Sequence, residues 1–257
     1  MNTSKIFDLS GRVAVITGGN GGIGLGMAKG MAAAGATIVV AGRDAAKNTA
    51  AVSEILSAGG KASAIPVDVL EEKSCRALIA GTMTAHGRLD ILVNNAGMSI
   101  RKQPEDYTLA EWHTVLDSNL TSAFLCSQAA YPAMKKGGAG KVINIGSMMS
   151  IFGASFATAY AASKGGIVQF SRACATAWAK DNIQVNAVLP GWIDTDLTKG
   201  ARREVQGLHE RVLGRTPAGR WGIPSDFAGI AVFLASAASD FVTGTAIPVD
   251  GGFSVQG

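Results

Sequence analysis

The sequence predicts an α/β fold in which a single doubly wound parallel sheet carries helices on both faces. Two observations predict it: short apolar segments alternate along the chain with longer helical patterns, and a glycine-rich turn joins the first of those segments to the first helix. Such alternation is typical of βαβ units and of a parallel sheet. Hydrophobic residues make up 47% of the 257 residues and charged residues 16%, which allows a large core. We therefore expect one domain over residues 1–257.

The expected strands are short apolar runs bounded by turn residues, and helical patterns separate them. In chain order the strands are 12–17, 37–41, 62–67, 89–93, 141–146, 183–189 and 245–249. The helices are 22–34, 45–58, 71–86, 109–136, 159–180 and 225–237. The segment 192–222 fits neither pattern, because it is rich in Gly, Arg and Thr. A long insertion at this place predicts a lid over the substrate, with a plain surface excursion as the alternative.

The first strand ends in a glycine-rich turn. Residues 12–17 form a buried strand pattern, and the run Gly18-Gly19-Asn20-Gly21-Gly22-Ile23-Gly24 leads from it into a helical stretch. Strand, glycine turn and helix are the context of a Rossmann-like dinucleotide-binding fingerprint, because glycines let the backbone approach the pyrophosphate and the helix N-terminus attracts it. Two registers fit: G-x-G-x-x-G through Gly19, Gly21 and Gly24, and T-G-x-x-x-G-x-G from Thr17 through Gly22 and Gly24.

Three polar residues in the second half of the chain suit proton transfer. Tyr160 and Lys164 are four residues apart in a predicted helix, so they share one face. A neighbouring cation lowers the pKa of a phenol from about 10 towards neutrality, as proton exchange with an alcohol or carbonyl oxygen requires. Ser147 follows the strand pattern Val142–Ile145 and so lies at a strand's carboxyl end, where open α/β sheets bind ligands. Taken alone, the Tyr/Lys pair could be ordinary helix surface.

Together these features resemble the short-chain dehydrogenase/reductase family over nearly the whole chain. The register through Gly18, Gly22 and Gly24 matches the family's glycine motif, and Asn94-Asn95-Ala96-Gly97 matches its N-N-A-G turn. Asn119 matches the family's helix asparagine, and Ser147, Tyr160 and Lys164 match its catalytic residues. Pro190-Gly191, followed by Thr195, matches the segment that contacts the nicotinamide carboxamide. Asp68-Val69 matches the adenine-contacting pair.

The resemblance implies an alcohol dehydrogenase or carbonyl reductase that interconverts a ketone and a secondary alcohol by hydride transfer. Tyr160 would be the general acid and base, Lys164 would lower its pKa and bind the nicotinamide ribose, and Ser147 would hydrogen-bond the substrate oxygen. Asn119 would hold a water that links Lys164 to solvent, or make a packing contact. The expected cofactor-binding residues are Gly18, Asn20, Gly22, Ile23, Gly24, Arg43, Asp68, Val69, Asn95, Ala96, Gly97, Tyr160, Lys164, Pro190, Gly191, Ile193 and Thr195.

Cofactor choice depends on the end of the second strand, Gly42-Arg43-Asp44. In relatives that prefer NAD, a carboxylate at the position of Gly42 binds the ribose 2′-OH, which glycine cannot do. Arg43 can pair with a 2′-phosphate through a charge-assisted contact. We therefore expect NADP(H), with NAD(H) as the second choice. Asp44 could also reach the ribose; its alternative role is the N-cap of the following helix.

The substrate is predicted by resemblance alone. Segments 147–150, 160–165, 215–222 and 238–242 resemble the gluconate 5-dehydrogenase and 2-deoxygluconate dehydrogenase branch, which implies a sugar acid or polyol. Arg101 could bind a carboxylate as a bidentate partner, or belong with Lys102 to a solvated pair. The expected substrate residues are Arg101, Met149, Phe152, Phe156 and Trp192. Four of them are apolar, which favours a less polar ketone, alicyclic or 3-oxoacyl, as the alternative. A non-catalytic dinucleotide-binding sensor would not need the intact trio.

Composition argues against other classes of function. Three scattered cysteines and three isolated histidines predict no metal site and no disulfide framework, and suggest a reducing compartment. A net charge of +4 without a large basic cluster does not favour nucleic-acid binding. The longest uncharged run, 142–163, contains Asn, Gly and Ser and does not suit a membrane span, and residues 1–10 lack a signal pattern. We expect a cytoplasmic protein whose partner is a small-molecule substrate.

The predicted helices 109–136 and 159–180 are too rich in small and apolar residues for faces washed by water. In the family these helices pair with their equivalents in a neighbour, and the C-terminal segment forms a second interface. Two different two-fold interfaces generate a D2 homotetramer. The alternative is that both helices are covered within one subunit.

Overall fold

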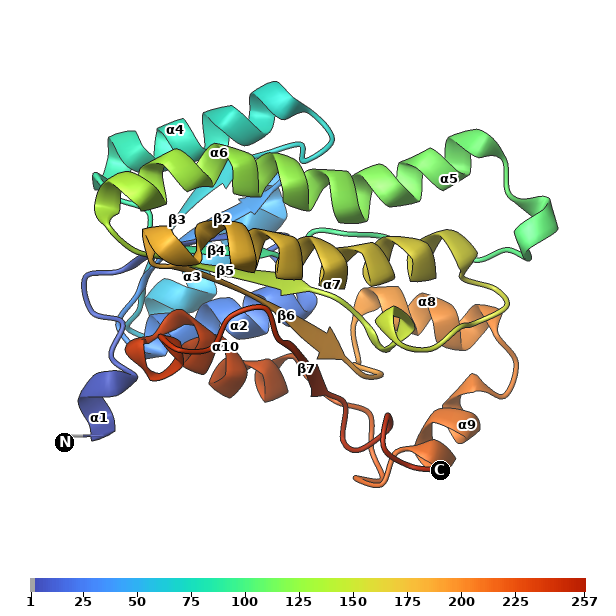
Figure 1. Ribbon diagram of the computed structural model, residues 1–257. Coiled ribbons are helices and arrows are strands. Elements are labelled where there is room, and N and C mark those ends of the chain that lie inside the picture. The colour runs from blue at the N-terminus through green and yellow to red at the C-terminus, as the bar shows by residue number, and fades with distance from the viewer. Residues whose placement is uncertain (1–2) are drawn as a thin grey trace.

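The seven apolar segments form one parallel sheet in the computed structural model, which describes residues 3–257 (Figure 1). The strand order is β3-β2-β1-β4-β5-β6-β7. The strands are β1 (Val13–Thr17), β2 (Thr37–Gly42), β3 (Lys61–Pro66), β4 (Ile91–Asn94), β5 (Gly140–Ile145), β6 (Ile183–Pro190) and β7 (Ala246–Val249). Each predicted strand is present, and no end is displaced by more than two residues. The predicted doubly wound sheet is therefore confirmed.

Helices cover both faces of the sheet, because alternate strand residues point to opposite sides. Ala14 and Ile16 of β1 pack against one helical layer, and Val13 and Val15 pack against the other. The first layer contains α2 (Gly22–Ala33), α3 (Ala45–Ser57) and α10 (Ala228–Ala235). The second contains α4 (Glu72–His86), α6 (Ser122–Gly137) and α7 (Thr158–Trp178). Figure 1 shows α4 and α6 above the strands, α7 crossing in front of them, and α2 and α10 below.

The chain reverses its direction of winding beside β1. It runs outward from β1 to β2 and β3, and returns to β4 on the other side of β1. At such a reversal the loops leave the carboxyl ends of adjacent strands in opposite directions and open a crevice. The register places Thr17 beside Asn94, and Asn94 beside Asn144. The glycine turn, the N-N-A-G turn and Ser147 therefore emerge at one edge of the sheet.

Two glycines of α2 allow the close approach of α10. A Cβ atom at Gly26 would lie 2.0 Å from the carbonyl oxygen of Pro224, and one at Gly30 would lie 2.6 Å from the Cβ of Ala228. Both distances are far inside van der Waals contact, so larger residues would push the helices apart. The contact fixes the helix that follows the glycine turn.

Three segments differ from the prediction. The expected helix 109–136 is two helices, α5 (Leu109–Leu116) and α6, joined by the π-helical turn η2 (Asp117–Thr121). The helix expected at 225–237 begins as the 3₁₀ turn η5 (Pro224–Phe227) and ends at Ala235. The segment 192–222, for which a lid was predicted and which is called the lid segment below, contains two short helices, α8 (Asp196–Glu204) and α9 (Leu208–Arg215), that the sequence analysis did not predict.

The remaining elements are short. They are α1 (Thr3–Ile6) and the 3₁₀ turns η1 (Pro104–Asp106), η3 (Met148–Ser150), η4 (Ala179–Asp181) and η6 (Ala237–Ser239). Over residues 3–257, no helix combines the length and the apolar character that a membrane crossing needs.

Candidate active site

The carboxyl edge of the sheet brings the predicted catalytic trio into one cavity. Ser147 follows β5, while Tyr160 and Lys164 lie one turn apart on α7. All three line a cavity of about 270 Å³ that also contains residues of the glycine turn and of the segment 190–198. The i,i+4 pair and the strand-end serine, which are separate in the sequence, therefore share one space.

Lys164 is buried and anchored to the sheet. Its side chain is 4% exposed, and its Nζ donates a hydrogen bond of 2.7 Å to the carbonyl oxygen of Ile145. Burial lowers the pKa of Lys164 to about 8, because a charged ammonium loses its hydration there. The Nζ lies 5.6 Å from the centre of the Tyr160 ring. Lys164 therefore places a readily lost proton beside the phenol.

Tyr160 differs from the expectation of a lowered pKa. Burial raises the pKa of Tyr160 above its ordinary value, although part of the ring stays open to the cavity. The Ser147 hydroxyl and then the Arg101 charge oppose this rise without overcoming it. The phenol consequently keeps its proton at neutral pH, as a proton donor to a carbonyl must.

Asn119 lies in the π-helical turn, where its side chain has protein partners on both ends of the amide. Its Oδ1 accepts a hydrogen bond of 2.7 Å from the Met98 amide, and its Nδ2 donates to the Met98 carbonyl at 2.9 Å. The Nδ2 also donates to Ser163 Oγ at 2.9 Å, and Ser163 Oγ donates to the Tyr160 carbonyl. Asn119 therefore makes the packing contact that was the alternative to a water-holding role. Its bonds connect the segment after the N-N-A-G turn to the helical turn that carries Tyr160.

Hydrogen bonds join the glycine turn to the N-N-A-G turn. Thr17 Oγ1 accepts bonds of 3.1 Å from the amides of Asn95 and Ala96. Asn95 Nδ2 donates in return to the carbonyls of Thr17, at 3.1 Å, and Gly18, at 3.0 Å. Gly18 has φ +63°, which favours glycine. Thr17 was not among the predicted site residues; its place at the start of the T-G motif was the signal that could have found it.

Two connected cavities form a groove that fits a dinucleotide. The trio's cavity also holds Gly22, Ile23, Asn95, Pro190, Gly191, Ile193 and Thr195. A cavity of about 350 Å³ continues it past the end of β2, lined by the predicted residues Arg43, Asp68, Val69 and Ala96. Gly18, Asn20 and Gly97 line both. Gly24 lines neither; a Cβ there would lie 2.4 Å from the Gly18 carbonyl oxygen, so Gly24 closes the turn instead.

The second cavity has two cations near the end of β2. Lys47, which was not among the predicted site residues, lines it together with Arg43. Asp44 also lines it, but its Oδ1 accepts a hydrogen bond of 3.0 Å from the Lys47 amide and caps α3. Asp44 is therefore the N-cap of α3, the second of the two roles expected for it. The cations suit a phosphate group at this end of the groove.

A third cavity, of about 90 Å³, adjoins Ser147 and Tyr160. Four of the five predicted substrate residues line it: Arg101, Met149, Phe156 and Trp192. Phe152 does not. Its ring packs against Phe253, with ring centres 6.3 Å apart, and beneath the guanidinium of Arg215.

Arg101 is bonded to the lid segment. Its Nη1 donates to Glu204 Oε2 at 2.8 Å and its Nη2 donates to the Leu197 carbonyl at 2.9 Å. The side chain is 14% exposed. Arg101 thus bridges both ends of α8 while it lines the small cavity, and a ligand carboxylate would meet Glu204 as a competitor.

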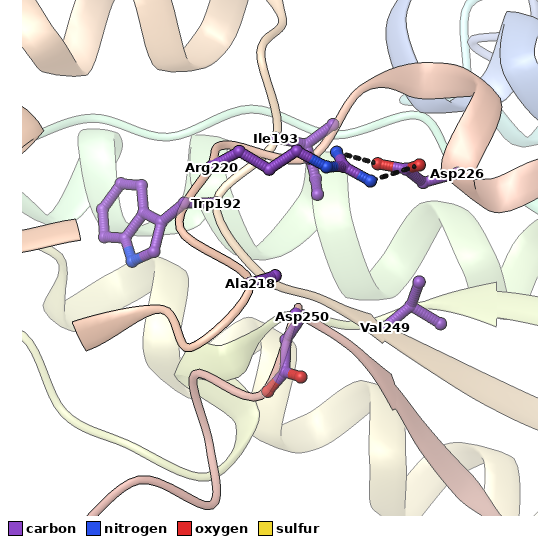
Figure 2. A pocket seen from close by; sticks show the side chains of 9 residues that line it. Trp192, Ile193, Ala218, Arg220, Asp226, Val249 and Asp250 are labelled. Carbon is purple, nitrogen blue, oxygen red and sulfur yellow. Dashed lines mark hydrogen bonds and ion pairs between the residues drawn. The ribbon is translucent and has the colours of Figure 1, made fainter. Parts of the chain in front are cut away.

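A further cavity, of about 230 Å³, is lined in part by Trp192 and Ile193, and Figure 2 shows the side chains around it. Ala218 and Arg220 of the lid segment line it together with Val249 and Asp250. Arg220 pairs with Asp226 through bonds of 2.7 and 2.9 Å, so its charge is neutralised at the rim. Trp192 lines both this cavity and the small one beside Tyr160. Its ring also packs edge to face against Trp221, with ring centres 5.7 Å apart.

Residues 3–257 contain no group of three or more His, Cys, Asp or Glu side chains arranged to hold a metal ion.

Comparisons with known proteins agree over nearly the full length. A family model described as enoyl-(acyl carrier protein) reductase matches residues 18–254. The 2-dehydro-3-deoxy-D-gluconate 5-dehydrogenase of Escherichia coli K12 is 42% identical over 248 residues, which cover 96% of this chain and 97% of the relative. The 5-keto-D-gluconate 5-reductase of the same strain is 40% identical over 252 residues, with 98% and 99% covered. A solved gluconate 5-dehydrogenase from Burkholderia cenocepacia J2315, in complex with NADP and tartrate, is 38% identical with TM-score 0.93 and coverages of 98% and 99%.

The lowered pKa of Lys164 predicts a pH dependence of stability. Between pH about 8 and the ordinary lysine pKa of about 10, the unfolded chain keeps a proton that the folded chain has lost. Stability rises with pH wherever the unfolded state binds more protons. Compared with Lys164→Met, the wild type should therefore gain free energy of unfolding across this range, by at most about 1.4 kcal/mol per pH unit. Urea unfolding of both proteins measures this difference, and a constant difference would contradict the buried charge.

Proposed function

The chain belongs to the short-chain dehydrogenase/reductase family, as its motifs predicted, and from that premise we propose that it interconverts a ketone and a secondary alcohol of a sugar acid or polyol. It is an oxidoreductase acting on CH–OH groups, and its cofactor is NADP(H), with NAD(H) as the second choice. The observation that carries the proposal is the meeting of Ser147, Tyr160 and Lys164 where the dinucleotide groove adjoins the small cavity.

Bound NADPH supplies a hydride to the substrate carbon, and NADP⁺ accepts one in the reverse direction. The chain's own groups manage the proton. Tyr160, which holds its proton at neutral pH, donates it to the carbonyl oxygen. Ser147 Oγ accepts a bond from the Met149 amide, so its own hydrogen is available for the developing alkoxide. Lys164 stands behind the phenol with a pKa of about 8 and favours its ionised form as the proton leaves.

Arg101 supports an acidic substrate. It lines the cavity next to Tyr160, and its planar guanidinium suits a carboxylate. The relatives named above act, by their names, on gluconate derivatives, and one was solved with the dicarboxylate tartrate. The lid segment would cover this substrate, since Trp192, Leu197, Thr198 and Ala201 form one side of the cavity.

A less polar ketone, alicyclic or 3-oxoacyl, is the second candidate. Met149, Phe156, Trp192 and Leu197 present apolar walls to the small cavity, which would leave several hydroxyl groups of a polyol without partners. Arg101 is the feature that separates the two candidates, because an uncharged ketone has no use for it.

A homotetramer accounts for apolar surface on two sides of the subunit. On α6 and α7, Phe124 is 45% exposed and its ring meets Phe170 edge to face, with centres 6.5 Å apart. Near the C-terminus, Phe241 and Val255 are almost fully exposed. Two such patches can form two different two-fold interfaces and so a D2 tetramer. The three free cysteines fit the cytoplasm as its location.

Tyr160→Phe tests the proposed chemistry. It removes the proton donor, so turnover of ketones should fall by about 10²–10⁴-fold while NADPH binding is kept. Tyr131→Phe is the matched control, because that hydroxyl bonds Asp181 away from the cavities. Steady-state rates and fluorescence titration measure the two effects. Activity of Tyr160→Phe within about tenfold of the wild type would refute the role of the phenol.

Arg101→Met tests the substrate class. Loss of one charge-assisted contact should raise KM for sugar acids about tenfold to hundredfold and leave KM for neutral ketones of similar size nearly unchanged. Glu204→Gln should lower KM for the acids, because it removes the competing carboxylate. A panel of acids and neutral ketones measures both variants. Equal changes for the two kinds of substrate would favour the less polar ketone.

Light scattering tests the assembly. The wild type should have a mass near four times the 26.2 kDa of one chain. Phe124→Asp should give a smaller species, because a buried charge opposes the contact between apolar helices. A wild-type mass of one chain would exclude the tetramer.

A further inference from the structure

Gly42, the last residue of β2, has no room for a side chain. The residue is buried, and a Cβ atom there would lie 2.5 Å from Asn20 Nδ2 and 2.9 Å from Asn48 Oδ1. Non-bonded heavy atoms prefer separations of about 3.5–4.0 Å. The space into which a residue at this position would grow is therefore filled by two side-chain amides, one from the glycine turn and one from α3.

The two amides are held in place by hydrogen bonds. Asn20 Nδ2 donates to Asn48 Oδ1 at 2.7 Å, and Asn48 Nδ2 donates to the Gly42 carbonyl at 2.8 Å. Asn48 is 3% exposed, so its amide cannot turn to water without losing both partners. Asn48 thus connects the end of β2, the glycine turn and α3 at the point where the groove ends.

The charges around Gly42 favour an anion. Arg43 and Lys47 are exposed and line the same cavity as Gly42 and Asn20. The carboxylate of Asp44 is turned to the N-terminus of α3, where its Oδ1 accepts from the Lys47 amide. A carboxylate that binds the ribose 2′-OH would have to come from position 42, and the asparagine pair occupies its place.

We propose that Asn20 and Asn48 are specificity residues for the cofactor, an inference that rests on the proposed use of NADP(H). The pair excludes a ribose-binding carboxylate from the end of β2. It also holds the backbone at Gly42, so that Arg43 and Lys47 meet a 2′-phosphate. Selection between the two dinucleotides then depends on a buried hydrogen-bonded pair as well as on surface cations.

Four proteins test the pair: the wild type, Gly42→Asp, Asn48→Ala and the double variant. Dissociation constants for NADPH and NADH come from fluorescence titration, which needs no substrate. Gly42→Asp alone should bind NADPH poorly and gain little affinity for NADH, because its carboxylate meets the asparagine pair. The double variant should bind NADH at least about tenfold more tightly than either single variant, a non-additive result expected of residues in contact. Equal NADH affinity of Gly42→Asp and the double variant would overturn the proposal.

Thermal unfolding shows whether each variant folds. If Gly42→Asp does not, Gly42→Ala places the same Cβ against the pair at lower cost. Gly42→Ala should then weaken NADPH binding severalfold, and adding Asn48→Ala should restore most of it by freeing Asn20 to move. Absence of that restoration would overturn the proposal.

Asp44→Ala is the matched control. It removes the helix cap and should lower the melting temperature while leaving the ratio of NADPH to NADH affinity unchanged within about twofold. A selective loss of NADH affinity would show that Asp44, and not the asparagine pair, governs the choice between the two cofactors.

Arg43→Ala and Lys47→Ala should each weaken NADPH binding, by about tenfold to hundredfold for Arg43, with little effect on NADH binding. Wild-type preference for NADH would refute the proposed cofactor itself, which separates that failure from failure of the inference.

Discussion

The hydrogen-bonded joint between the turns after β1 and β4 is the contact on which the rest of the site depends. Both strands are buried on both faces, so their last peptide groups need partners where the sheet ladder stops. Thr17 Oγ1 and Asn95 Nδ2 supply these partners to each other's turns. The joint holds Gly18 and Gly97 beside one groove, and the carboxyl ends of β5 and β6 complete it.

Burial acts on Tyr160 and Lys164 in opposite senses. It raises the pKa of the phenol and lowers that of the ammonium, because each loses water that would stabilise its charged form. Since the ordinary values are 10.0 for the phenol and 10.5 for the ammonium, the two pKa values cross, and Lys164 loses its proton more readily than Tyr160 does. The carbonyl of Ile145 offsets part of the cost of burying Lys164, and Asn119 fixes the turn that carries the phenol. Tyr160 and Lys164 are thus positioned by the carbonyl of Ile145 and by the side chains of Asn119 and Ser163.

The lid segment is attached to the site by charged groups. Arg101 reaches from the N-N-A-G side to α8, where it donates to Glu204 Oε2 and to the Leu197 carbonyl. Such contacts exchange partners more readily than a packed apolar core does, because water and ligand carboxylates compete for them. On the opposite wall of the small cavity, Trp192 also lines the cavity of Figure 2 and packs edge to face against Trp221.

By itself the sequence determined the seven strands, the order of the motifs and the trio Ser147, Tyr160 and Lys164, because these depend on periods of two and 3.6 residues and on turns a few residues long. Tertiary structure alone decided the partner of Arg101, which is Glu204, 103 residues away, and that of Asn20, which is Asn48, 28 residues away. It also turned Phe152 away from the small cavity, inserted the π-helical turn at Asn119 and raised the pKa of Tyr160. Local periodicity does not indicate which distant side chain packs at a given place or how much water that side chain displaces. The chemistry of the site depends on both, because contacts and burial set the pKa values and the positions of its groups.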